Sequence, residues 1–257
     1  MPDLLFERQG PLAVVTFNRP EARNAMTFAM YEGLVAACES VDQEPEIRVL
    51  ILRGAGGKAF VAGTDISQFQ AFQAPEDALQ YEERISRVVS RLEAVTKPTI
   101  AAIEGFAVGG GASLALACDL RYATPESKIG VPIARTLGNC LAMENYARIL
   151  DLLGPARTKE MIFRARLIEA TEAHAAGLFN AVVPAPELWA TVQAVATEIA
   201  GHAPITIRVT KEAIRRIQAH RRAPGGEDLV LQAYMSDDFK EGVRAFLEKR
   251  KPVWTGR

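Results

Sequence analysis

The chain is poor in the residues on which metal and disulfide chemistry depend. Its 257 residues include three cysteines and three histidines. The cysteines are widely spaced and lie in mostly apolar surroundings, so they form neither a disulfide framework nor a zinc-ligand pattern. The histidines all lie beyond residue 170 and show no ligand spacing. We therefore expect no bound metal and a reducing, cytoplasmic location.

The chain also lacks a strong net charge and a long apolar run. Its net charge is −1 and its pI is near 6.4, so no global field favours nucleic acid or an anionic membrane. The longest uncharged stretch, Gly105–Cys118, is too short and too rich in glycine to span a bilayer. The N-terminus has no basic segment followed by a cleavable apolar one. We expect neither a nucleic-acid partner nor a membrane partner.

What the chain does have is an ordinary globular composition with alternating short strands and helices. Hydrophobic residues make up 49% and charged residues 24% of the sequence, which suits one large soluble domain. Strand-like and helix-like stretches alternate as far as about Ala142, and the later pattern is helical. This indicates α/β architecture followed by a helical C-terminal part. We divide the chain into an α/β core over residues 1–195 and a helical region over residues 196–257.

Individual elements follow from caps, turns and apolar stretches. A helix capped by Thr27 is expected to run to about Asp42, and another from about Pro75 to Val95. A late turn is expected at Ala223-Pro224-Gly225-Gly226. The expected strands are Leu4–Arg8 and Leu12–Phe17, which form a hairpin, and Val49–Leu52, Thr99–Ile103 and Leu120–Ala123.

Two glycine-bearing segments carry the main chemical signal. They are Ala62-Gly63-Thr64-Asp65 and Gly109-Gly110-Gly111-Ala112-Ser113, and each follows an apolar run where a helix could begin. Backbone N–H groups at a helix start attract negative charge, and glycine lets a ligand approach the backbone. Two such groups that converge on one point form an oxyanion hole, in which one donor is worth about 10²–10³ in rate.

Plainer explanations exist for parts of this pattern. The triple glycine could serve only close packing of a strand and a helix, and Asp65 could be only the N-cap of a helix that begins near Ile66. A dinucleotide site is disfavoured, because the glycines do not follow the first strand and no suitable acidic residue lies about twenty positions later. The two segments together favour the oxyanion hole.

At this point the sequence resembles the crotonase superfamily, also called the enoyl-CoA hydratase/isomerase family. The loop Asn18–Met26 is similar to the first CoA-contacting loop of that family, and the two glycine segments are similar to its oxyanion-hole segments. The stretch Glu241–Pro252 is similar to its C-terminal signature. Four motifs in the family's order, over nearly the whole chain, carry the resemblance. It implies a spiral of ββα units with a C-terminal helical trimerisation region, assembled as a homotrimer or homohexamer.

The resemblance also implies roles for particular residues. The main-chain N–H groups of Thr64 and Gly110 would hold the carbonyl oxygen of an acyl-CoA thioester, with no prosthetic group and with coenzyme A as part of the substrate. Plain surface roles remain open for Arg23 and Lys249. The residues that would contact the coenzyme A portion are Arg23, Ala25, Ala62, Thr64, Phe246 and Lys249.

The pattern departs from the family at the two glutamates that activate and deliver water in its hydratases. The first would fall two residues after the triple glycine, where this chain has Ser113. The second would follow Pro132, where the chain has Ile133 and then Ala134, neither of which can carry a proton. Ordinary two-glutamate hydration is therefore doubtful, and so is the usual isomerase mechanism with one glutamate.

Several residues could take over this chemistry, and each has a plainer alternative. Ser113 could orient water or a substrate carboxylate, or it could bond to a carbonyl of its own helix. Glu144 is the nearest carboxylate, but its spacing from Arg148 favours a solvated ion pair. Arg135 could pair with a substrate carboxylate or lie on the surface. The residues that we assign to the acyl pocket are Ile133, Arg135 and Asn139.

These observations lead to one functional prediction and one rival. We expect an acyl-CoA-processing lyase or isomerase that stabilises a thioester enolate or oxyanion with backbone N–H groups. Decarboxylation and lyase cleavage fit, because they need the oxyanion hole and not the missing glutamates. The rival is a non-catalytic acyl-CoA-binding protein, which would keep the N–H groups and perform no chemistry.

Overall fold

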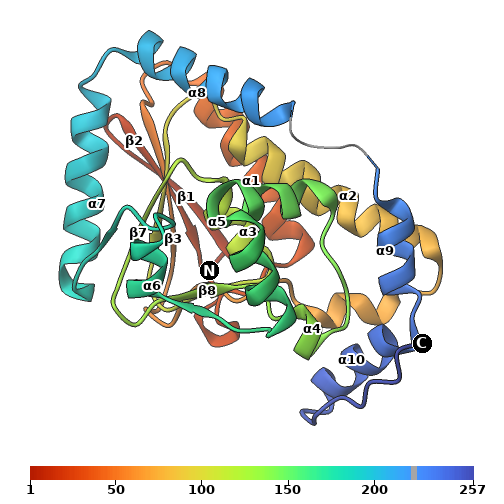
Figure 1. Cartoon of the computed structure of the whole chain (residues 1–257). Coiled ribbons are helices and arrows are strands. Elements are labelled where there is room, and N and C mark those ends of the chain that lie inside the picture. The colour runs from red at the N-terminus through yellow and green to blue at the C-terminus, as the bar shows by residue number, and fades with distance from the viewer. Residues whose placement is uncertain (221–224) are drawn as a thin grey trace.

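The computed structural model describes residues 1–220 and 225–257, and Figure 1 shows an α/β core with helices at its edge. Within these residues, six strands form the larger sheet in the order β1-β2-β3-β5-β7-β10. The pair β1 and β2 is antiparallel, and the other pairs of this sheet are parallel. The strands are β1 (Leu4–Gln9), β2 (Leu12–Phe17), β3 (Val49–Gly54), β5 (Thr99–Ile103), β7 (Leu120–Ala123) and β10 (Ala181–Val182).

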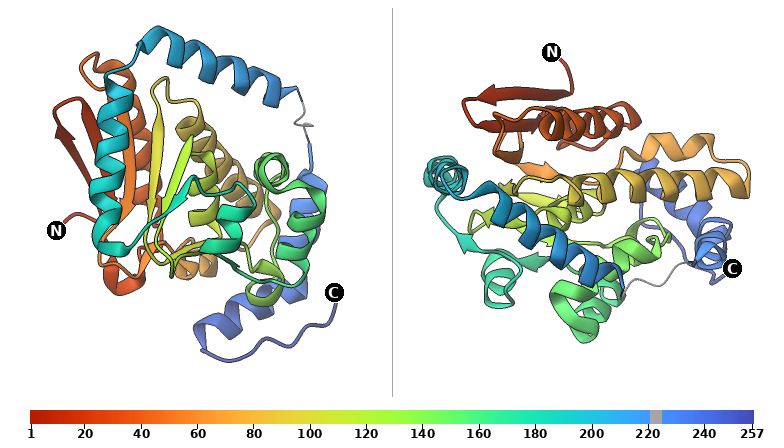
Figure 2. Two further views of the ribbon diagram at one scale, coloured as in Figure 1. Left: turned by 60° about the vertical axis from the view of Figure 1, so that its left-hand side comes forward. Right: turned by 90° about the horizontal axis from the view of Figure 1, so that it is seen from above.

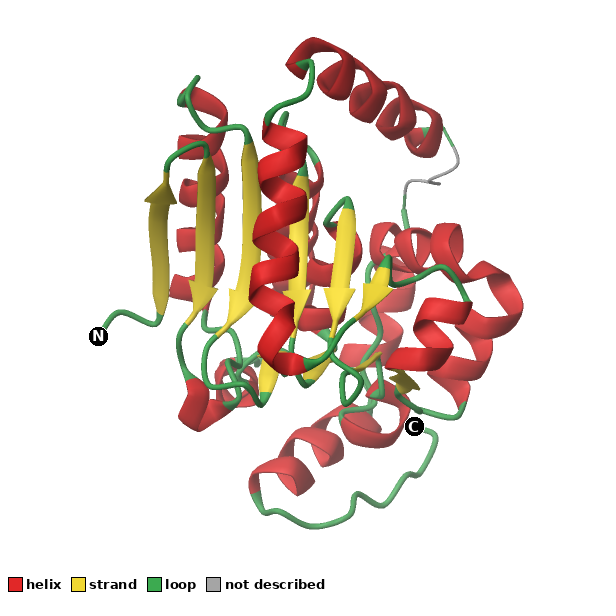
Figure 3. Cartoon of the chain, turned by 90° about the vertical axis from the view of Figure 1, so that its left-hand side faces the viewer, coloured by secondary structure: helices red, strands yellow, loops and turns green. Residues whose placement is uncertain are grey.

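Helices cover both faces of the larger sheet (Figure 3). Helix α7 (Ala185–Ala200) lies along one face, where Leu188 and Val192 pack against β2, β3 and β5. The other face is covered by α1 (Phe28–Gln43), α2 (Pro75–Glu93) and α3 (Gly110–Ala117). Because both faces are covered, every residue of the central strand β5 is buried, and the strand is mainly apolar.

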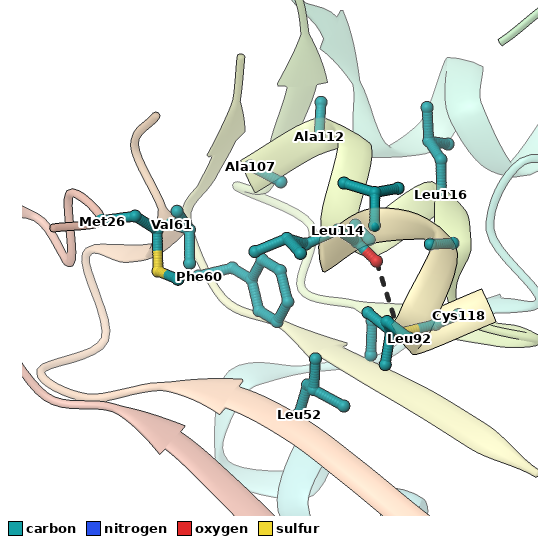
Figure 4. Packing of buried hydrophobic residues seen from close by; sticks show 14 of the residues in the cluster. Met26, Leu52, Phe60, Val61, Leu92, Ala107, Ala112, Leu114, Leu116 and Cys118 are labelled. Carbon is teal, nitrogen blue, oxygen red and sulfur yellow. Dashed lines mark hydrogen bonds between the residues drawn. The ribbon is translucent and has the colours of Figure 1, made fainter. Parts of the chain in front are cut away.

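The core beneath α3 is closely packed (Figure 4). Phe60, Leu92 and Leu114 converge there from three elements, and all three side chains are fully buried. The Sγ of Cys118 donates to the carbonyl oxygen of Leu114 at 3.5 Å. This packing holds the start of α3 in a fixed relation to the strand that contains Phe60.

A second, smaller sheet carries the two glycine segments. Its order is β4-β6-β8-β9, and β4 and β6 are parallel neighbours. The four strands are short, so the sequence offered too little periodicity to predict them. They are β4 (Ala59–Val61), β6 (Phe106–Val108), β8 (Lys128–Gly130) and β9 (Ile168–Glu169).

The expected helix start at Thr27 is confirmed. The Oγ1 of Thr27 accepts a hydrogen bond from the N–H of Met30 at 3.2 Å, and α1 begins at Phe28. The strands expected at Thr99–Ile103 and Leu120–Ala123 have the predicted bounds. The first two residues of the turn expected at Ala223-Pro224-Gly225-Gly226 lie outside the described residues.

The chain after Ala142 is mainly helical, with two exceptions. Strands β9 and β10 add to the edges of the two sheets, so the expectation of a purely helical segment is wrong at these points. Two-residue strands leave no alternation in the sequence from which they could be recognised. The helices from residue 133 onward are α4 (Ile133–Thr136), α5 (Met143–Phe163), α6 (Ala170–Ala175), α7, α8 (Pro204–Ala219), α9 (Glu227–Tyr234) and α10 (Asp237–Leu247).

Helix α8 projects from the body of the protein (Figures 1 and 2). Helices α9 and α10, in contrast, pack against the body of the protein. None of the residues of α8 is buried, and Ile205, Val209 and Ile217 are more than half exposed. Helix α9 contacts α2, and α10 contacts the 3-10 helix η2 (Ile66–Ala71). Among the described residues, no helix has the length and apolar character that crossing a membrane requires.

Candidate active site

The two glycine segments lie side by side. A Cβ added to Gly109 would be 3.7 Å from the Cα of Gly63, and a Cβ added to Gly110 would be 3.5 Å from the Oγ1 of Thr64. The parallel pairing of β4 and β6 explains this approach, because the two segments leave the small sheet at the same edge. Residues that are distant in the sequence are thus brought to one place.

The amide N–H groups of Thr64 and Gly110 are available to a ligand. Gly110 is the first residue of α3, where an N–H group has no acceptor within the helix. On either side of Thr64, Met26 donates its N–H to Gly63 and Asp65 donates its N–H to Met26, at 2.8 and 2.9 Å. In the part of the chain that the structure describes, neither the Thr64 amide nor the Gly110 amide donates to a protein acceptor.

The three consecutive glycines are required for different reasons. Gly109 has a positive φ of 56°, which favours glycine. A Cβ on Gly110 would lie 2.6 Å from the hydroxyl oxygen of Tyr31, and a Cβ on Gly111 would lie 2.0 Å from the carbonyl oxygen of Val61. The packing explanation is therefore right for Gly111, and it leaves the amide of Gly110 unused.

The side chain of Thr64 forms hydrogen bonds with two tyrosines. Its Oγ1 lies 2.9 Å from the hydroxyl of Tyr31 on α1 and 2.8 Å from the hydroxyl of Tyr81 on α2. Burial raises the pKa of both tyrosines, so both hydroxyls stay protonated. These bonds fix the position of Thr64, and with it the direction of its amide.

The loop before α1 is attached to the segment that contains Thr64. Met26 and Thr64 form a parallel β-bridge, and Ala62 donates its N–H to the carbonyl of Arg23 at 3.1 Å. Four of the residues predicted to contact coenzyme A are therefore neighbours in the structure: Arg23, Ala25, Ala62 and Thr64.

Asn24 organises this loop, a role that the sequence analysis missed. Its side chain is fully buried, and its backbone φ is 57°. The Oδ1 accepts from the N–H of Arg19 at 2.9 Å, and the Nδ2 donates to the carbonyls of Ala55 and Ala59 at 3.0 and 2.7 Å. An asparagine tolerates this backbone conformation and bonds to nearby backbone, which is the signal that could have identified it.

The expected capping role of Asp65 is confirmed. The Oδ1 of Asp65 accepts from the N–H of Ser67 at 3.2 Å, directly before η2 begins. The other carboxylate oxygen forms an ion pair with Arg19 at 3.2 Å. Asp65 therefore secures the turn after Thr64 and links it to the loop before α1.

Comparison with known proteins identifies the family of this chain. The family described as enoyl-CoA hydratase/isomerase matches residues 7–257. The chain belongs to this family. The resemblance to the crotonase superfamily is thereby confirmed, and with it the assignment to an enzyme family.

Similar proteins cover almost the whole chain. The short-chain-enoyl-CoA hydratase of Clostridium acetobutylicum is 34% identical over 97% of this chain and 96% of its own length. The crotonyl-CoA hydratase of Syntrophomonas wolfei is 35% identical with the same coverage, 97% and 96%. Both proteins are named as hydratases of CoA thioesters.

Solved structures confirm the crotonase-like α/β fold. A methylmalonyl-CoA decarboxylase in complex with 2-nitronate-propionyl-CoA has a TM-score of 0.91 at 30% identity and covers 100% of this chain and 99% of its own. An enoyl-CoA hydratase/carnithine racemase from Magnetospirillum magneticum has a TM-score of 0.81 at 37% identity and covers 100% and 97%. These two differently named proteins therefore have the same backbone fold as this chain.

The C-terminal residues assigned to coenzyme A lie on the surface of this family member. Phe246 on α10 is 52% exposed, and Lys249 beyond it is exposed with a positive φ of 53°. Arg23 is also exposed, and its guanidinium lies 5.9 Å from the ring centroid of Phe106. All three side chains remain accessible to a large ligand or to another subunit.

The positions where hydratases of the family would carry glutamates lie near the glycine segments. Ser113 is buried on α3, and its N–H donates to the carbonyl of Gly109 at 3.1 Å. Within the described residues its Oγ makes no bond to a helix carbonyl, so the plainer alternative for this serine is not seen. Ile133 is buried at the start of α4 and offers only an apolar surface.

The predicted solvated ion pair of Glu144 and Arg148 is wrong. The side chain of Arg148 is 3% exposed, and its Nη2 lies 3.0 Å from a carboxylate oxygen of Glu93 and 2.8 Å from the hydroxyl of Ser90. Sequence spacing along one helix could not reveal these partners, which belong to α2. Glu144 is half-buried in the first turn of α5.

The other two residues assigned to the acyl pocket differ in their surroundings. Arg135 is exposed on α4, and no ion pair of its side chain is found among residues 1–220 and 225–257. The Nδ2 of Asn139 donates to the hydroxyl oxygen of Tyr234 at 3.0 Å. The Oδ1 of Asn139 is buried and has no hydrogen-bond partner in the described part of the chain.

A buried carboxyl group that the sequence analysis missed lies next to these groups. Glu82 on α2 is 5% exposed and follows Tyr81 directly. One carboxyl oxygen accepts from the hydroxyl of Tyr234 at 2.5 Å, and the other accepts from the N–H of Ala142 at 2.9 Å. Burial raises the pKa of Glu82 to about 7, opposed by these two hydrogen bonds and assisted by the charge of Glu144.

Proposed function

We propose that this protein is an acyl-CoA-processing enzyme that stabilises a thioester enolate or oxyanion with the amide N–H groups of Thr64 and Gly110. The observation that carries the proposal is the approach of these two groups, neither of which has an acceptor in the described chain. The start of α3 adds positive potential at the same point. Charge that develops on a thioester oxygen would therefore be stabilised more strongly than the neutral carbonyl.

The proposed substrate is a CoA thioester, with no prosthetic group. The names of the similar proteins support this class, because they refer to enoyl-CoA, crotonyl-CoA and methylmalonyl-CoA. The exposed guanidinium of Arg23 is suited to the phosphates, and backbone atoms near Ala62 and Thr64 are suited to the adenine. Phe246 and Lys249 are assigned to the coenzyme A of a neighbouring subunit in a homotrimer or homohexamer.

The proposed chemistry depends on the oxyanion hole and not on the usual pair of glutamates. Ser113 and Ile133 occupy the positions that carry them in the hydratases, so efficient hydration of crotonyl-CoA is not expected. Ser113 is proposed to orient a substrate group, since its hydroxyl has no protein partner in the described chain. Decarboxylation, lyase cleavage and proton transfer at the α-carbon all pass through a stabilised enolate and remain open.

Removal of one amide donor tests this function. A proline at position 110 lacks the N–H, but its Cβ would meet the hydroxyl of Tyr31. We therefore compare Gly110→Pro/Tyr31→Phe with Tyr31→Phe alone, on a panel of acyl-CoA thioesters whose products are identified by mass spectrometry. We expect turnover of any active thioester to fall about 10²-fold or more, because one oxyanion donor is lost. Thermal melting checks that both variants are folded.

Two outcomes would contradict the proposal in different ways. Equal turnover in the two variants would show that the amide of Gly110 takes no part in the reaction. Tight binding of acyl-CoA without any product would support the rival, a non-catalytic acyl-CoA-binding protein. Binding is measured by isothermal titration calorimetry with butyryl-CoA and crotonyl-CoA.

A further inference from the structure

The strongest unexplained feature of the molecule is a set of buried polar groups enclosed by aromatic rings. Phe69, Phe72 and Phe239 lie against the rings of Tyr81 and Tyr234, with ring centroids between 4.7 and 6.5 Å apart. The ring centroids of the two tyrosines are 6.1 Å apart. The rings come from η2 and the residue after it, and from α2, α9 and α10. Tyr234 bonds the cluster to the carboxyl group of Glu82, and Tyr81 bonds it to the hydroxyl of Thr64.

Hydrogen bonds connect the cluster to the oxyanion site on one side and to an open acceptor on the other. Tyr81 bonds to Thr64, whose amide is one of the proposed oxyanion donors. Tyr234 donates to Glu82 and accepts from Asn139, whose Oδ1 is buried and lacks a partner in the described chain. A buried acceptor without a hydrogen bond costs free energy. We therefore expect a donor from outside the chain to bond to the Oδ1 of Asn139.

Glu82 is a titratable carboxyl group that is buried without a positively charged partner among the described residues. The carboxyl group accepts bonds from the N–H of Ala142 and from Tyr234, and it thereby joins α2 to α5 and α9. Each carboxyl oxygen accepts one of these bonds, whereas glutamine would present its donating NH2 group to one of the two donors. The two bonds therefore favour a carboxyl group, although burial of its ionised form costs free energy. No lysine, arginine or histidine within the described residues forms an ion pair with Glu82. Because burial of an ionisable group costs free energy, its presence at this position indicates a function in proton transfer.

We propose that Glu82 is the acid–base residue that exchanges a proton with the α-carbon of an acyl-CoA bound at Thr64 and Gly110. The inference rests on the proposed function and deepens it, since it supplies the proton carrier that Ser113 and Ile133 cannot provide. Tyr234 and Asn139 are positioning residues, which hold the carboxyl group through the hydrogen bonds described above.

The step is balanced within the site. The Glu82 carboxylate takes a hydrogen from the α-carbon as a proton, and an O–H bond forms as the C–H bond breaks. The C–H electron pair forms the carbon–carbon double bond of the enolate, and the carbonyl electron pair moves to the thioester oxygen, which the amides of Thr64 and Gly110 stabilise. Return of the proton to the α-carbon regenerates both partners, and no further reactant is consumed.

The surroundings of Glu82 define how its proton affinity should respond to substitution. The titratable groups that face it are Glu144 and Tyr146 on α5, Tyr31 on α1, Tyr81 on its own helix, Tyr234 on α9 and Cys140 before α5. The negative charge of Glu144 raises the pKa of Glu82, and the hydrogen bond from Tyr234 lowers it. Removing the charge of Glu144 should therefore lower the pKa of Glu82, and removing the hydroxyl of Tyr234 should raise it.

The test is exchange of the α-hydrogen of butyryl-CoA for deuterium in D2O, followed by mass spectrometry. We expect the wild type to exchange and Glu82→Gln to lose about 10²-fold or more in rate, since glutamine keeps the shape but cannot accept the proton. The exposed neighbour Glu83 supplies the matched control Glu83→Gln, which should exchange at the wild-type rate. Melting temperatures establish that both variants are folded.

The pH dependence separates a proton carrier from a merely structural group. In the wild type, exchange should rise with pH through about 7, where Glu82 loses its proton. This rise should move to lower pH in Glu144→Gln and to higher pH in Tyr234→Phe. Unmoved profiles, or an unchanged rate in Glu82→Gln, would overturn the assignment of Glu82.

The variant Gly110→Pro/Tyr31→Phe distinguishes failure of this inference from failure of the proposed function. Loss of exchange in that variant, with full exchange in Glu82→Gln, would leave the oxyanion site in place and remove Glu82 from the mechanism. Exchange retained in both variants would remove the oxyanion site as well. No exchange in the wild-type protein would overturn α-proton transfer by Glu82.

Discussion

The hydroxyl of Tyr31 lies directly against Gly110, and a Cβ on Gly110 would be only 2.6 Å from its oxygen. The same hydroxyl is hydrogen-bonded to the side chain of Thr64 at 2.9 Å. One buried phenol therefore sets the space available to one proposed oxyanion donor and helps to hold the other. The two segments are coupled through α1 as well as through the small sheet.

This contact predicts a conditional effect of Gly110→Ala. In the wild-type background the added methyl group must displace Tyr31, so the free energy of unfolding should fall by about 1–3 kcal/mol. In a Tyr31→Phe background the oxygen is gone, and the nearest ring carbon would be 3.8 Å from the methyl group. Chemical denaturation of the four proteins in this cycle should show that most of the cost of Gly110→Ala disappears. Equal costs in both backgrounds would show that Tyr31 does not limit the space at Gly110.

The buried carboxyl group of Glu82 predicts a pH-dependent stability. Its pKa is raised from an ordinary 4.5 to about 7, so between these pH values the unfolded chain loses a proton that the folded chain keeps. The contribution of Glu82 to stability is therefore highest at low pH and falls as the pH rises from 4.5 to 7. Glu82→Gln lacks this dependence, and its stability relative to the wild type should increase by about 3 kcal/mol across this interval.

Urea denaturation at pH 5 and pH 7.5 measures this change, with Glu83→Gln as the baseline for loss of one exposed carboxylate. A constant difference between Glu82→Gln and the wild type would mean that the carboxyl group of Glu82 titrates alike in the folded and unfolded chains. This measurement needs no substrate, so it examines the electrostatics of the site independently of the proposed reaction.

The exposed apolar side chains of α8 predict self-association. Ile205, Val209 and Ile217 are spaced so that they share one side of a helix that has no buried residue. A homotrimer of the 28.0 kDa chain would have a mass of about 84 kDa, and a homohexamer about twice that. We expect Val209→Asp to lower the mass measured by light scattering, because it places a charge in an apolar contact.

The substitution Gln218→Asp adds the same charge on the side of α8 opposite Val209 and serves as the control. An oligomer that withstands Val209→Asp, or a wild-type protein that is monomeric, would rule out α8 as the main contact between copies. Equal disruption by Gln218→Asp would show that the association does not depend on the apolar side of α8.

Local sequence signals were sufficient for the larger elements. Thr27 can cap a helix whatever lies around it. Thr99–Ile103 is mainly apolar because both of its faces are covered. The short strands of the second sheet were not predicted, because three residues or fewer carry no period and depend on their partners in the sheet.

The candidate site was predictable only where its chemistry belongs to the backbone. The two glycine-bearing segments could be proposed because glycine-rich segments at helix starts expose N–H groups wherever they occur. The resemblance to the crotonase superfamily pointed to Thr64 and Gly110 within them. Glu82 could not be proposed, since the run Tyr81-Glu82-Glu83-Arg84 is indistinguishable in sequence from a solvated helix face. Its burial depends on Tyr234, which reaches it from another helix late in the chain.

The sequence by itself determined that this chain has an α/β core with two segments able to present free amide groups, because these properties arise from residue type and local order. Only the tertiary structure decided which side chains accompany those amides. Arg148 pairs with Glu93, and Tyr234 bonds to Glu82, through contacts between helices that are far apart along the chain. Burial and charge depend on such contacts, and the proton affinity of a carboxyl group depends on both.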